Sequence, residues 1–257
     1  LRRADGTYAS VIDRSQIIRD EAGRDLTLAC ARLGLQTDYI YHSDDLPTDV
    51  YMAIEGANGL IAAIADAHSL EAAGDKILSP LMDGRLGSLT APFAGTIALD
   101  GNLTHSLLSE IATSPAFGQA DLRLAPASPG KAERLLPLLP HPNATIYVNL
   151  EEAGLLCHRV FANAAEAARG LLDRGAARVL VTDGGHVCAD GAGDIITDLP
   201  PPVMVTRITG AGDTFMAAHI LAERRGAPRD QALEQRRVLE VGGRVGGRAG
   251  CCCWCIS

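Results

Sequence analysis

The sequence predicts an α/β fold with a mostly parallel sheet covered by helices on both faces. From about residue 95 onward, short apolar runs of strand length alternate with longer runs of helical pattern. Because these short runs are apolar without strict alternation, they are typical of buried parallel strands. In addition, polar or Gly-rich loops follow four of these runs in succession, which is where ligands gather in such folds.

The composition fits a single large domain. The chain has 257 residues, and 47% of them are hydrophobic. A net charge of −8 without a basic block argues against nucleic-acid binding. No apolar run approaches the roughly 20 residues of a membrane span, and the first ten residues lack the apolar centre of a signal peptide. We therefore expect a cytoplasmic protein that binds neither nucleic acid nor membrane.

The first elements differ from the later alternation. Residues 21–33 place apolar side chains at helical spacing, and Gly34 marks the end of this expected helix. Two extended runs, 50–54 and 60–64, then flank the hairpin-type connection "EGANG". We expect these runs to form a small β appendage, a lid, within about residues 39–66.

The remaining elements follow the alternating pattern of the predicted parallel sheet. Strands are expected at 95–102, 121–128, 144–150 and 177–185. Helices are expected at 105–115, 130–139, 163–175 and 212–226. No internal repeat or linker divides the chain, so residues 1–257 are expected to form one domain.

Polar residues follow each predicted strand, and the carboxyl ends of parallel strands meet at one edge of the sheet. These residues are Asp100 and Asn102, Ser128, Asn149 and Glu152, and the run Thr182, Asp183, Gly184 and Gly185. Each also has a purely structural interpretation. Asp100 and Asn102 are suited to capping a loop, Asn149 with Glu152 to a helix N-terminus, and the last run to a plain turn.

The run Gly210, Ala211, Gly212 and Asp213 precedes an apolar segment. One interpretation is a turn followed by a helix, since Gly relaxes the backbone and Asp commonly opens helices. The other is an anion site, because small residues leave N–H groups bare at a helix N-terminus. A carboxylate there makes chemical sense if it takes a proton from a nucleophile beside a phosphate.

The cysteines and histidines do not indicate a metal site. Cys30, Cys157 and Cys188 are isolated in the sequence, and four more cysteines lie in the terminal run "CCCWC". That run lacks the paired spacing of a zinc site, and adjacent cysteines converge poorly on one tetrahedral ion. The seven histidines form no cluster, so we expect them to be surface or incidental residues.

Several of these motifs together resemble one protein family. The segment "TGAGDTFMAAHI" resembles the signature of the ribokinase-like, PfkB-type sugar and nucleoside kinases. "NLEEA" resembles the Asn-x-x-Glu element of that family, "VLVTDGGHV" its nucleotide-side strand and loop, and "PTDVYMAIEGANGLIAAIADAH" its lid. The resemblance covers about residues 20–225. Within the family, the lid, "LDGNL" and "APASPGKAERL" look most like bacterial pseudouridine kinases.

The resemblance implies a three-layer sandwich that transfers a phosphoryl group from ATP to a sugar 5′-hydroxyl, with pseudouridine as the acceptor. The alternatives are another nucleoside, a sugar such as ribose or fructose, or an inactive remnant that still binds nucleotide. By resemblance, Asp213 would be the catalytic base, and the N–H groups of Gly210, Ala211 and Gly212 would form the anion hole. Phosphoryl transfer needs positioning and charge stabilisation, which such groups supply.

The resemblance also implies the surroundings of the reaction. Asn149 and Glu152 would hold Mg²⁺, through water, together with the phosphates. Thr182, Asp183, Gly184 and Gly185 would border ATP, and Lys131 would reach a phosphate unless it is simply solvated. Thr48 and Tyr51 of the lid, with Asp100 and Asn102, would contact the acceptor, although Tyr51 also suits hairpin packing. Family members often dimerise through the lid, so a homodimer is implied.

The two ends of the chain depart from the family pattern. Nothing matches the family's opening strand and Gly-Gly-x-x-x-Asn helix, and "IIRDEAG" has Ile18 and Arg19 where the family shows Gly and Asp. We therefore expect the chain to start inside the fold. Residues 236–257 read like a GC-rich coding region translated out of frame. An RNA-binding Gly/Arg tail is the alternative, but the segment is short and lacks repeated RGG units.

Overall fold

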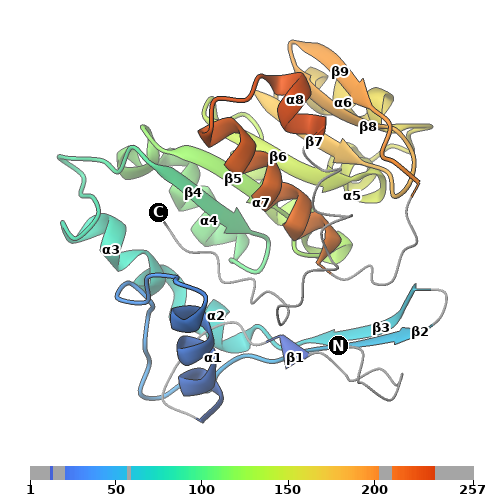
Figure 1. Ribbon diagram of the computed structural model, residues 1–257. Coiled ribbons are helices and arrows are strands. Elements are labelled where there is room, and N and C mark those ends of the chain that lie inside the picture. The colour runs from blue at the N-terminus through green and yellow to red at the C-terminus, as the bar shows by residue number, and fades with distance from the viewer. Residues whose placement is uncertain (1–11, 14–20, 57–58, 203–209, 235–257) are drawn as a thin grey trace.

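The computed structural model describes residues 12–13, 21–56, 59–202 and 210–234. Within them the chain forms a three-stranded sheet and a separate six-stranded sheet. In Figure 1 the smaller sheet lies below the larger one. The unusual run 236–257 and the segment 18–19 lie outside the described residues.

The smaller sheet contains the predicted hairpin. Strands β1 (Ile12–Asp13), β2 (Tyr51–Gly56) and β3 (Gly59–Ala65) pair antiparallel in that order. Helix α1 (Glu21–Arg32) confirms the first predicted helix. Gly34 follows it with φ +79°, the left-handed conformation that commonly ends helices.

Three short helical segments connect the two sheets, and the sequence pattern had not indicated them. They are α2 (His68–Ala73), the 3₁₀ segment η1 (Gly74–Leu78) and α3 (Ser79–Met82). The buried carboxylate of Asp49 accepts hydrogen bonds from the backbone N–H groups of Ser69, at 3.0 Å, and Leu70, at 2.9 Å. It therefore ties the base of the hairpin to the first turn of α2.

The larger sheet begins with four parallel strands, as the sequence predicts. They are β4 (Thr96–Asp100), β5 (Asp121–Ala125), β6 (Ala144–Asn149) and β7 (Arg178–Thr182). Two antiparallel strands, β8 (Cys188–Ala192) and β9 (Asp194–Asp198), complete the sheet. These two were not predicted, because the segment is rich in Gly and Asp, which are depleted in strands.

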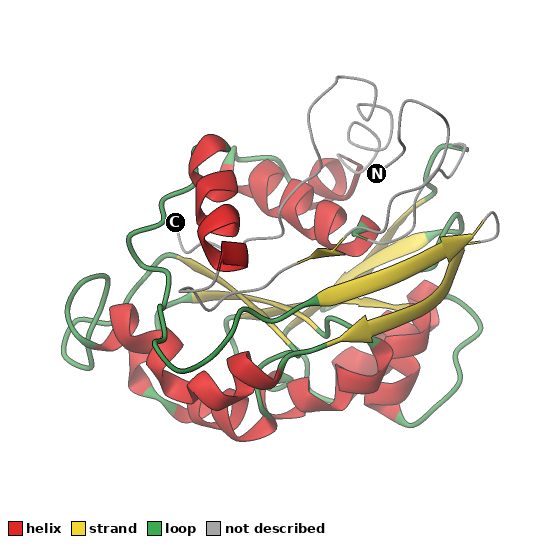
Figure 2. Cartoon of the chain, turned by 90° about the horizontal axis from the view of Figure 1, so that it is seen from below, coloured by secondary structure: helices red, strands yellow, loops and turns green. Residues whose placement is uncertain are grey.

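Helices cover both faces of the larger sheet (Figure 2). One face carries α4 (His105–Thr113), α5 (Leu150–Cys157), α6 (Ala164–Asp173) and the 3₁₀ segments η2 (Pro115–Phe117) and η3 (Pro129–Leu138). The other carries α7 (Ala211–Arg224) and α8 (Arg229–Glu234). The segment 130–139 was expected as an α-helix. Its 3₁₀ form agrees with Pro137 inside it, because proline clashes with the carbonyl of the preceding turn.

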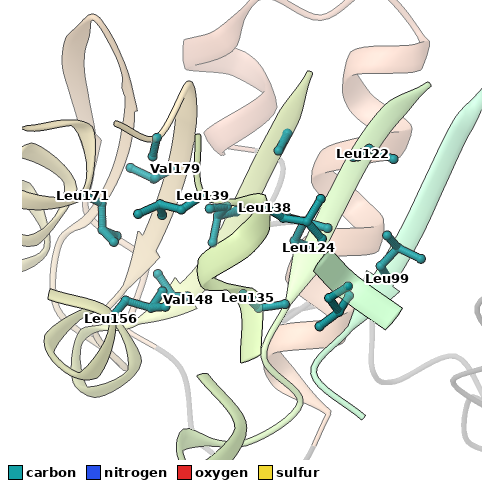
Figure 3. Packing of buried hydrophobic residues seen from close by; sticks show 14 of the residues in the cluster. Leu99, Leu122, Leu124, Leu135, Leu138, Leu139, Val148, Leu156, Leu171 and Val179 are labelled. Carbon is teal, nitrogen blue, oxygen red and sulfur yellow. The ribbon is translucent and has the colours of Figure 1, made fainter. Parts of the chain in front are cut away.

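Alternate residues of each central strand face opposite layers. Leu122, Leu124, Ile146 and Val179 are fully buried in the larger cluster, against α4, η3, α5 and α6. Figure 3 shows Leu122, Leu124 and Val179 among the side chains of this cluster. Burying one such side chain contributes roughly 1.5–3 kcal/mol. On the opposite face, Tyr147 and Leu180 pack with Phe215, Met216 and Leu233 in a smaller cluster. This smaller cluster seats α7 on the sheet.

Two further expectations bear on the described residues. Cys30 and Cys188 are buried and Cys157 is partly buried, in keeping with the apolar or helical settings expected from the sequence. His219 contradicts the interpretation of the histidines as surface residues, because it is fully buried under α7. Across the described ranges, none of the helices is both long and apolar enough to cross a membrane.

Candidate active site

The carboxyl ends of the parallel strands bring the predicted polar residues to one edge of the sheet. Asp100, the last residue of β4, pairs with Ala125 at the end of β5. Asn149, the last residue of β6, pairs with Thr182, the last residue of β7. The smaller sheet lies on the side toward which β4 points in Figure 1.

Helix α7 begins at the Gly-Ala-Gly-Asp run. Gly210 precedes the helix with φ +85°, and Asp213 lies in the first turn. Glycine has no side chain with which to cap the first N–H groups, so these groups need other acceptors. The carbonyl of Gly210 accepts from the Thr214 backbone N–H at 3.0 Å and from its hydroxyl at 2.7 Å.

Three carboxylates from different elements interact electrostatically at this edge. Burial raises the pKa of Asp100, and the negative charge of Asp213 raises it further. Burial likewise raises the pKa of Glu152, and the charges of Glu151 and Asp213 add to the effect. Asp213 is therefore close enough to Asp100 and Glu152 to repel both, although the three residues lie far apart in the sequence.

The Asp100 side chain is held by its own loop. It accepts from the backbone N–H of Asn102 at 2.9 Å and from the Asn102 Nδ2 at 2.7 Å. The Nζ of Lys131 donates to the Asn102 Oδ1 at 2.5 Å. Asp100 thus has the loop-capping role that the sequence left open, and Lys131 is tied to this loop. A Cβ on Gly101 would lie 2.3 Å from the carbonyl oxygen of Pro126, so glycine is needed for this close approach.

Asn149 and Glu152 form a reciprocal cap on α5. The Asn149 Oδ1 accepts from the Glu152 N–H at 2.8 Å, and the Glu152 Oε2 accepts from the Asn149 N–H at 2.9 Å. This is the structural role that the sequence allowed for the pair. It fixes both side chains at the end of β6 without excluding a further function.

The loop after β7 carries the four residues expected near a nucleotide. Thr182 ends the strand, and the Asp183 Oδ2 lies 3.3 Å from the Nδ1 of His186. Gly184 has φ +54°, a left-handed conformation that favours glycine. Gly185 is exposed, and a Cβ there would meet no atom of the described residues within 4 Å.

The two hairpin candidates belong to the smaller sheet. Thr48 is buried three residues before the start of β2. Tyr51 begins β2, pairs with Ala65 of β3 and is partly buried. Tyr51 thus occupies the hairpin position that suited the packing alternative.

One group of polar residues was missed from the sequence. Beneath α7, Arg123, Tyr147 and Arg178 of three neighbouring strands contact His219 and Glu223 of the helix. The sequence did contain a signal of buried charge, because Arg123 lies in the middle of β5 and Arg178 begins β7, next to apolar residues in both strands. Their partners are up to 100 residues away in the sequence, so the pattern alone could not pair them.

The comparison with protein families decides which family this fold and site represent. A model described as the pfkB family carbohydrate kinase matches residues 17–235. The chain belongs to this family. A search of curated proteins finds no match.

Solved structures agree with the PfkB assignment at the level of the fold. A carbohydrate kinase from Agrobacterium tumefaciens is 22% identical, with a TM-score of 0.69 over 88% of this chain and 72% of that one. Arabidopsis thaliana ribokinase, complexed with ribose and ATP, is 19% identical, with a TM-score of 0.63 over 83% and 69%. Trypanosoma brucei brucei adenosine kinase is 14% identical, with a TM-score of 0.66 over 88% and 72%.

This PfkB chain is therefore a phosphotransferase of the carbohydrate kinase family, with a ribokinase-like α/β fold.

Proposed function

We propose that this PfkB kinase transfers the γ-phosphoryl group of ATP to the 5′-hydroxyl of a nucleoside, with pseudouridine as the acceptor. The observation that carries the transfer chemistry is the position of Asp213, in the first turn of α7 and within electrostatic reach of Asp100 and Glu152. The choice of pseudouridine is supported only by the resemblance of "LDGNL", "APASPGKAERL" and the lid segment to pseudouridine kinases.

Asp213 is proposed as the base that accepts the proton of the attacking hydroxyl. It is partly exposed at the start of α7, so an acceptor hydroxyl has access to it. Its negative charge contributes to the raised pKa values of Asp100 and Glu152, which are mainly due to burial. A carboxylate that gains a proton as the hydroxyl attacks suits the positioning role that phosphoryl transfer requires.

The N–H groups of Gly210, Ala211 and Gly212 are proposed to stabilise the transferring phosphoryl group. Gly212 supports this role, because a Cβ at this position would meet none of the described residues within 4 Å and no positive φ requires glycine there. Within the described part of the chain, neither packing nor backbone conformation therefore demands glycine at 212. Close approach of a ligand to the helix N-terminus is a reason that remains.

The charge at this edge fits a divalent cation held through water. The carboxylates of Asp100, Glu152 and Asp213 cannot offset the negative charge of the phosphates of ATP. Among the described residues, no three His, Cys, Asp or Glu side chains are placed to bind a metal directly. Mg²⁺ retains several waters in proteins, and Asn149 and Glu152 would hold it through them. Such an ion would neutralise charge on the phosphates.

The remaining residues are proposed as ligand contacts. Thr182, Asp183, Gly184 and Gly185 would border the nucleotide at the end of β7, and Lys131 would approach a phosphate. Asp100 and Asn102 would contact the acceptor from the end of β4, and the lid residues Thr48 and Tyr51 would contact it from the hairpin.

We also propose that the chain forms a homodimer through the hairpin of β2 and β3. Met52 and Ile54 alternate along one face of β2, and Ile64 pairs opposite Met52 on β3. Their side chains are 39%, 50% and 64% exposed, respectively. An apolar face of this kind on a small sheet is typical of an interaction surface.

The proposal is tested by ADP release from the purified chain with Mg-ATP. Pseudouridine, uridine, ribose, fructose and no acceptor should be compared in parallel. Release that requires pseudouridine supports the proposed acceptor, and release with ribose or fructose would replace it with a sugar. A folded chain that binds ATP and releases no ADP with any acceptor would contradict the catalytic proposal.

The role of Asp213 is tested by Asp213→Asn in the same assay. Because the amide cannot accept the proton, kcat should fall by roughly a thousandfold or more, with the ATP dissociation constant changed less than about twofold. Asp173→Asn, at the C-terminal end of α6 on the opposite face, removes the same charge and should leave kcat unchanged. Wild-type turnover by Asp213→Asn would remove this residue from the mechanism.

A further inference from the structure

A cluster of charged and polar side chains is buried between α7 and the sheet. It lies on the same helix as the proposed catalytic residues but at its opposite end. Its members come from three adjacent strands, β5, β6 and β7, and from α7 itself. They are Arg123, Tyr147, Arg178, His219 and Glu223.

Glu223 is the residue through which the helix is held. Its Oε2 accepts from Arg123 Nη1 of β5 at 2.5 Å, and its Oε1 accepts from Arg178 Nη1 of β7 at 2.5 Å. Burial alone would raise the pKa of Glu223, but the adjacent guanidinium groups of Arg178 and Arg123 outweigh it, and the pKa is lowered. The carboxylate is therefore ionised and attached to strands on both sides of β6.

His219, one turn earlier, makes the contact with the strand between them. Its Nδ1 lies 2.8 Å from the hydroxyl of Tyr147 on β6. Tyr147 also accepts from Arg123 Nη1 at 3.0 Å. Two residues of α7 thus contact three adjacent strands.

The arginines are in turn fixed from outside the helix. The Arg123 Nε donates to the Asp121 Oδ1 at 2.7 Å. Arg178 donates to Asp190 of β8, from Nε at 3.1 Å and from Nη2 at 2.7 Å. Residues of the sheet therefore orient both guanidinium groups independently of α7.

These contacts supply what the apolar contacts of α7 lack. Phe215 and Met216 hold the helix against the sheet, but apolar packing is non-directional and resists sliding weakly. Charge-assisted hydrogen bonds to two arginines are directional and fix both the axial position and the rotation of the helix. Asp213 is ten residues from Glu223, about 15 Å along a rigid helix, so a shift at one end appears at the other.

We propose that Glu223 is a positioning residue: by binding Arg123 and Arg178, it sets where the N-terminus of α7 lies relative to the strand ends. This inference rests on the proposed function in its kinetic part, because the groups positioned are Asp213 and the N–H groups of Ala211 and Gly212. Misplacing reacting groups by about 1 Å can lower the rate about a hundredfold. The contacts of Glu223 with Arg123 and Arg178, which we call the anchor, therefore affect catalysis from the other end of the helix.

Stability alone is a weaker account of this cluster. Replacing a buried ion pair with apolar residues of similar volume is often neutral or stabilising, because burying charges is costly. A cluster of this kind is better explained by the geometry that it imposes. If the cluster only stabilises the fold, Glu223→Gln should change the melting temperature alone. If it positions α7, Glu223→Gln should also change the folded protein at the N-terminus of α7.

The test compares Glu223→Gln with Arg229→Gln. Arg229 of α8 donates to Asp190 and Asp194, so its loss weakens the same cluster of ion pairs without removing a bond to α7. In each variant, kcat and KM are measured per folded molecule, and the backbone amide signals of Ala211 and Gly212 are recorded by NMR without ligands. The melting temperature is measured alongside.

We expect Glu223→Gln to shift the amide signals of Ala211 and Gly212 and to lower kcat about tenfold to a hundredfold, with KM for ATP within about threefold. Arg229→Gln should lower the melting temperature and leave both the amide signals and kcat close to wild type. Unmoved amide signals in Glu223→Gln, or the same kcat in both variants, would overturn the proposal.

Glu223→Asp covers the case in which Glu223→Gln does not fold. It keeps the negative charge that the two arginines need but is one methylene shorter, so it should fold and still displace the helix. The NMR measurement needs no substrate, which separates the two proposals. Shifted amides in an enzyme without kinase activity would count against the proposed function only, whereas unshifted amides in an active enzyme would count against the anchor only.

Discussion

His219 has an environment in which only its neutral form is stable. Its side chain has no exposed surface, and its ring lies between the Tyr147 hydroxyl and the Arg178 guanidinium. Burial lowers the pKa of His219 to about 4, although the adjacent Glu223 opposes this. Near neutral pH the ring is therefore uncharged, and a proton on it would add positive charge next to Arg123 and Arg178.

This residue should make the protein less stable in mild acid. In the unfolded chain the pKa of histidine is about 6.5, so between pH 6.5 and 4 the unfolded state binds more protons than the folded state. The free energy of unfolding should therefore decrease as the pH is lowered from 6.5 to 4, by about 3 kcal/mol from this one group. Urea denaturation at several pH values measures the change.

The matched variant is His219→Gln, which keeps a polar group beside Tyr147 and cannot titrate. Its free energy of unfolding should depend less steeply on pH between 6.5 and 4. Tyr147, Glu223, Arg123 and Arg178 also face this site, but all remain in the variant, so the difference between the two slopes reports on His219. Identical slopes would show that the imidazole is protonated without cost in the folded state.

At the level of the element, α5 shows how a cap and a ligand site use the same residues. The Asn-x-x-Glu spacing occurs again at α6, where the Asn163 side chain accepts from the Glu166 N–H at 2.9 Å and Glu166 accepts from the Ala162 N–H at 3.0 Å. The spacing alone therefore predicts a helix N-terminus. What distinguishes α5 is its place at the end of β6, near Asp213.

Glu152→Gln separates the cap from the proposed metal site. Glutamine can keep the capping hydrogen bond, since it occupies the same position in capping boxes, but it lacks the charge. We expect an unchanged melting temperature and a several-fold higher Mg²⁺ concentration for half-maximal ATP binding, measured by titration calorimetry. Glu166→Gln is the control, and its Mg²⁺ requirement should match wild type. An unaltered Mg²⁺ requirement in Glu152→Gln would show that Glu152 caps α5 and has no role in binding the metal.

The elements that the sequence predicted are those whose signals are local. Strands β4 to β7 are short, mostly apolar runs, and α4, α6 and α7 have apolar spacing with clear ends. Strands β8 and β9 were missed because their stability comes from pairing with β7 and each other, against the preference of their Gly and Asp residues.

The candidate site divides in the same way. Asp100, Asn149 and Thr182 could be placed from the sequence because each directly follows or ends a predictable strand. Arg123, Arg178 and Glu223 could not, because each is defined by partners on other elements. The contact between Arg123 and Glu223 spans 100 residues of sequence, and no periodic pattern relates them.

At the scale of the whole molecule, the hairpin face makes the state of association testable. If Met52, Ile54 and Ile64 form the dimer contact, Ile64→Lys should place a charge in that contact and convert dimers to monomers in sedimentation experiments. Val160→Lys is the control, because Val160 is 93% exposed outside the hairpin. A wild-type chain that sediments as a monomer would remove the dimer proposal.

The order of the larger sheet has a consequence for how the protein is made. From β4 to β9, every strand pairs with the one before it in the chain, so the spatial order equals the order of synthesis. Each new strand therefore pairs with a strand that has already been synthesised. The sheet can grow strand by strand as the chain leaves the ribosome. Helix α7, which carries the proposed base, is synthesised only after the strands on which it packs.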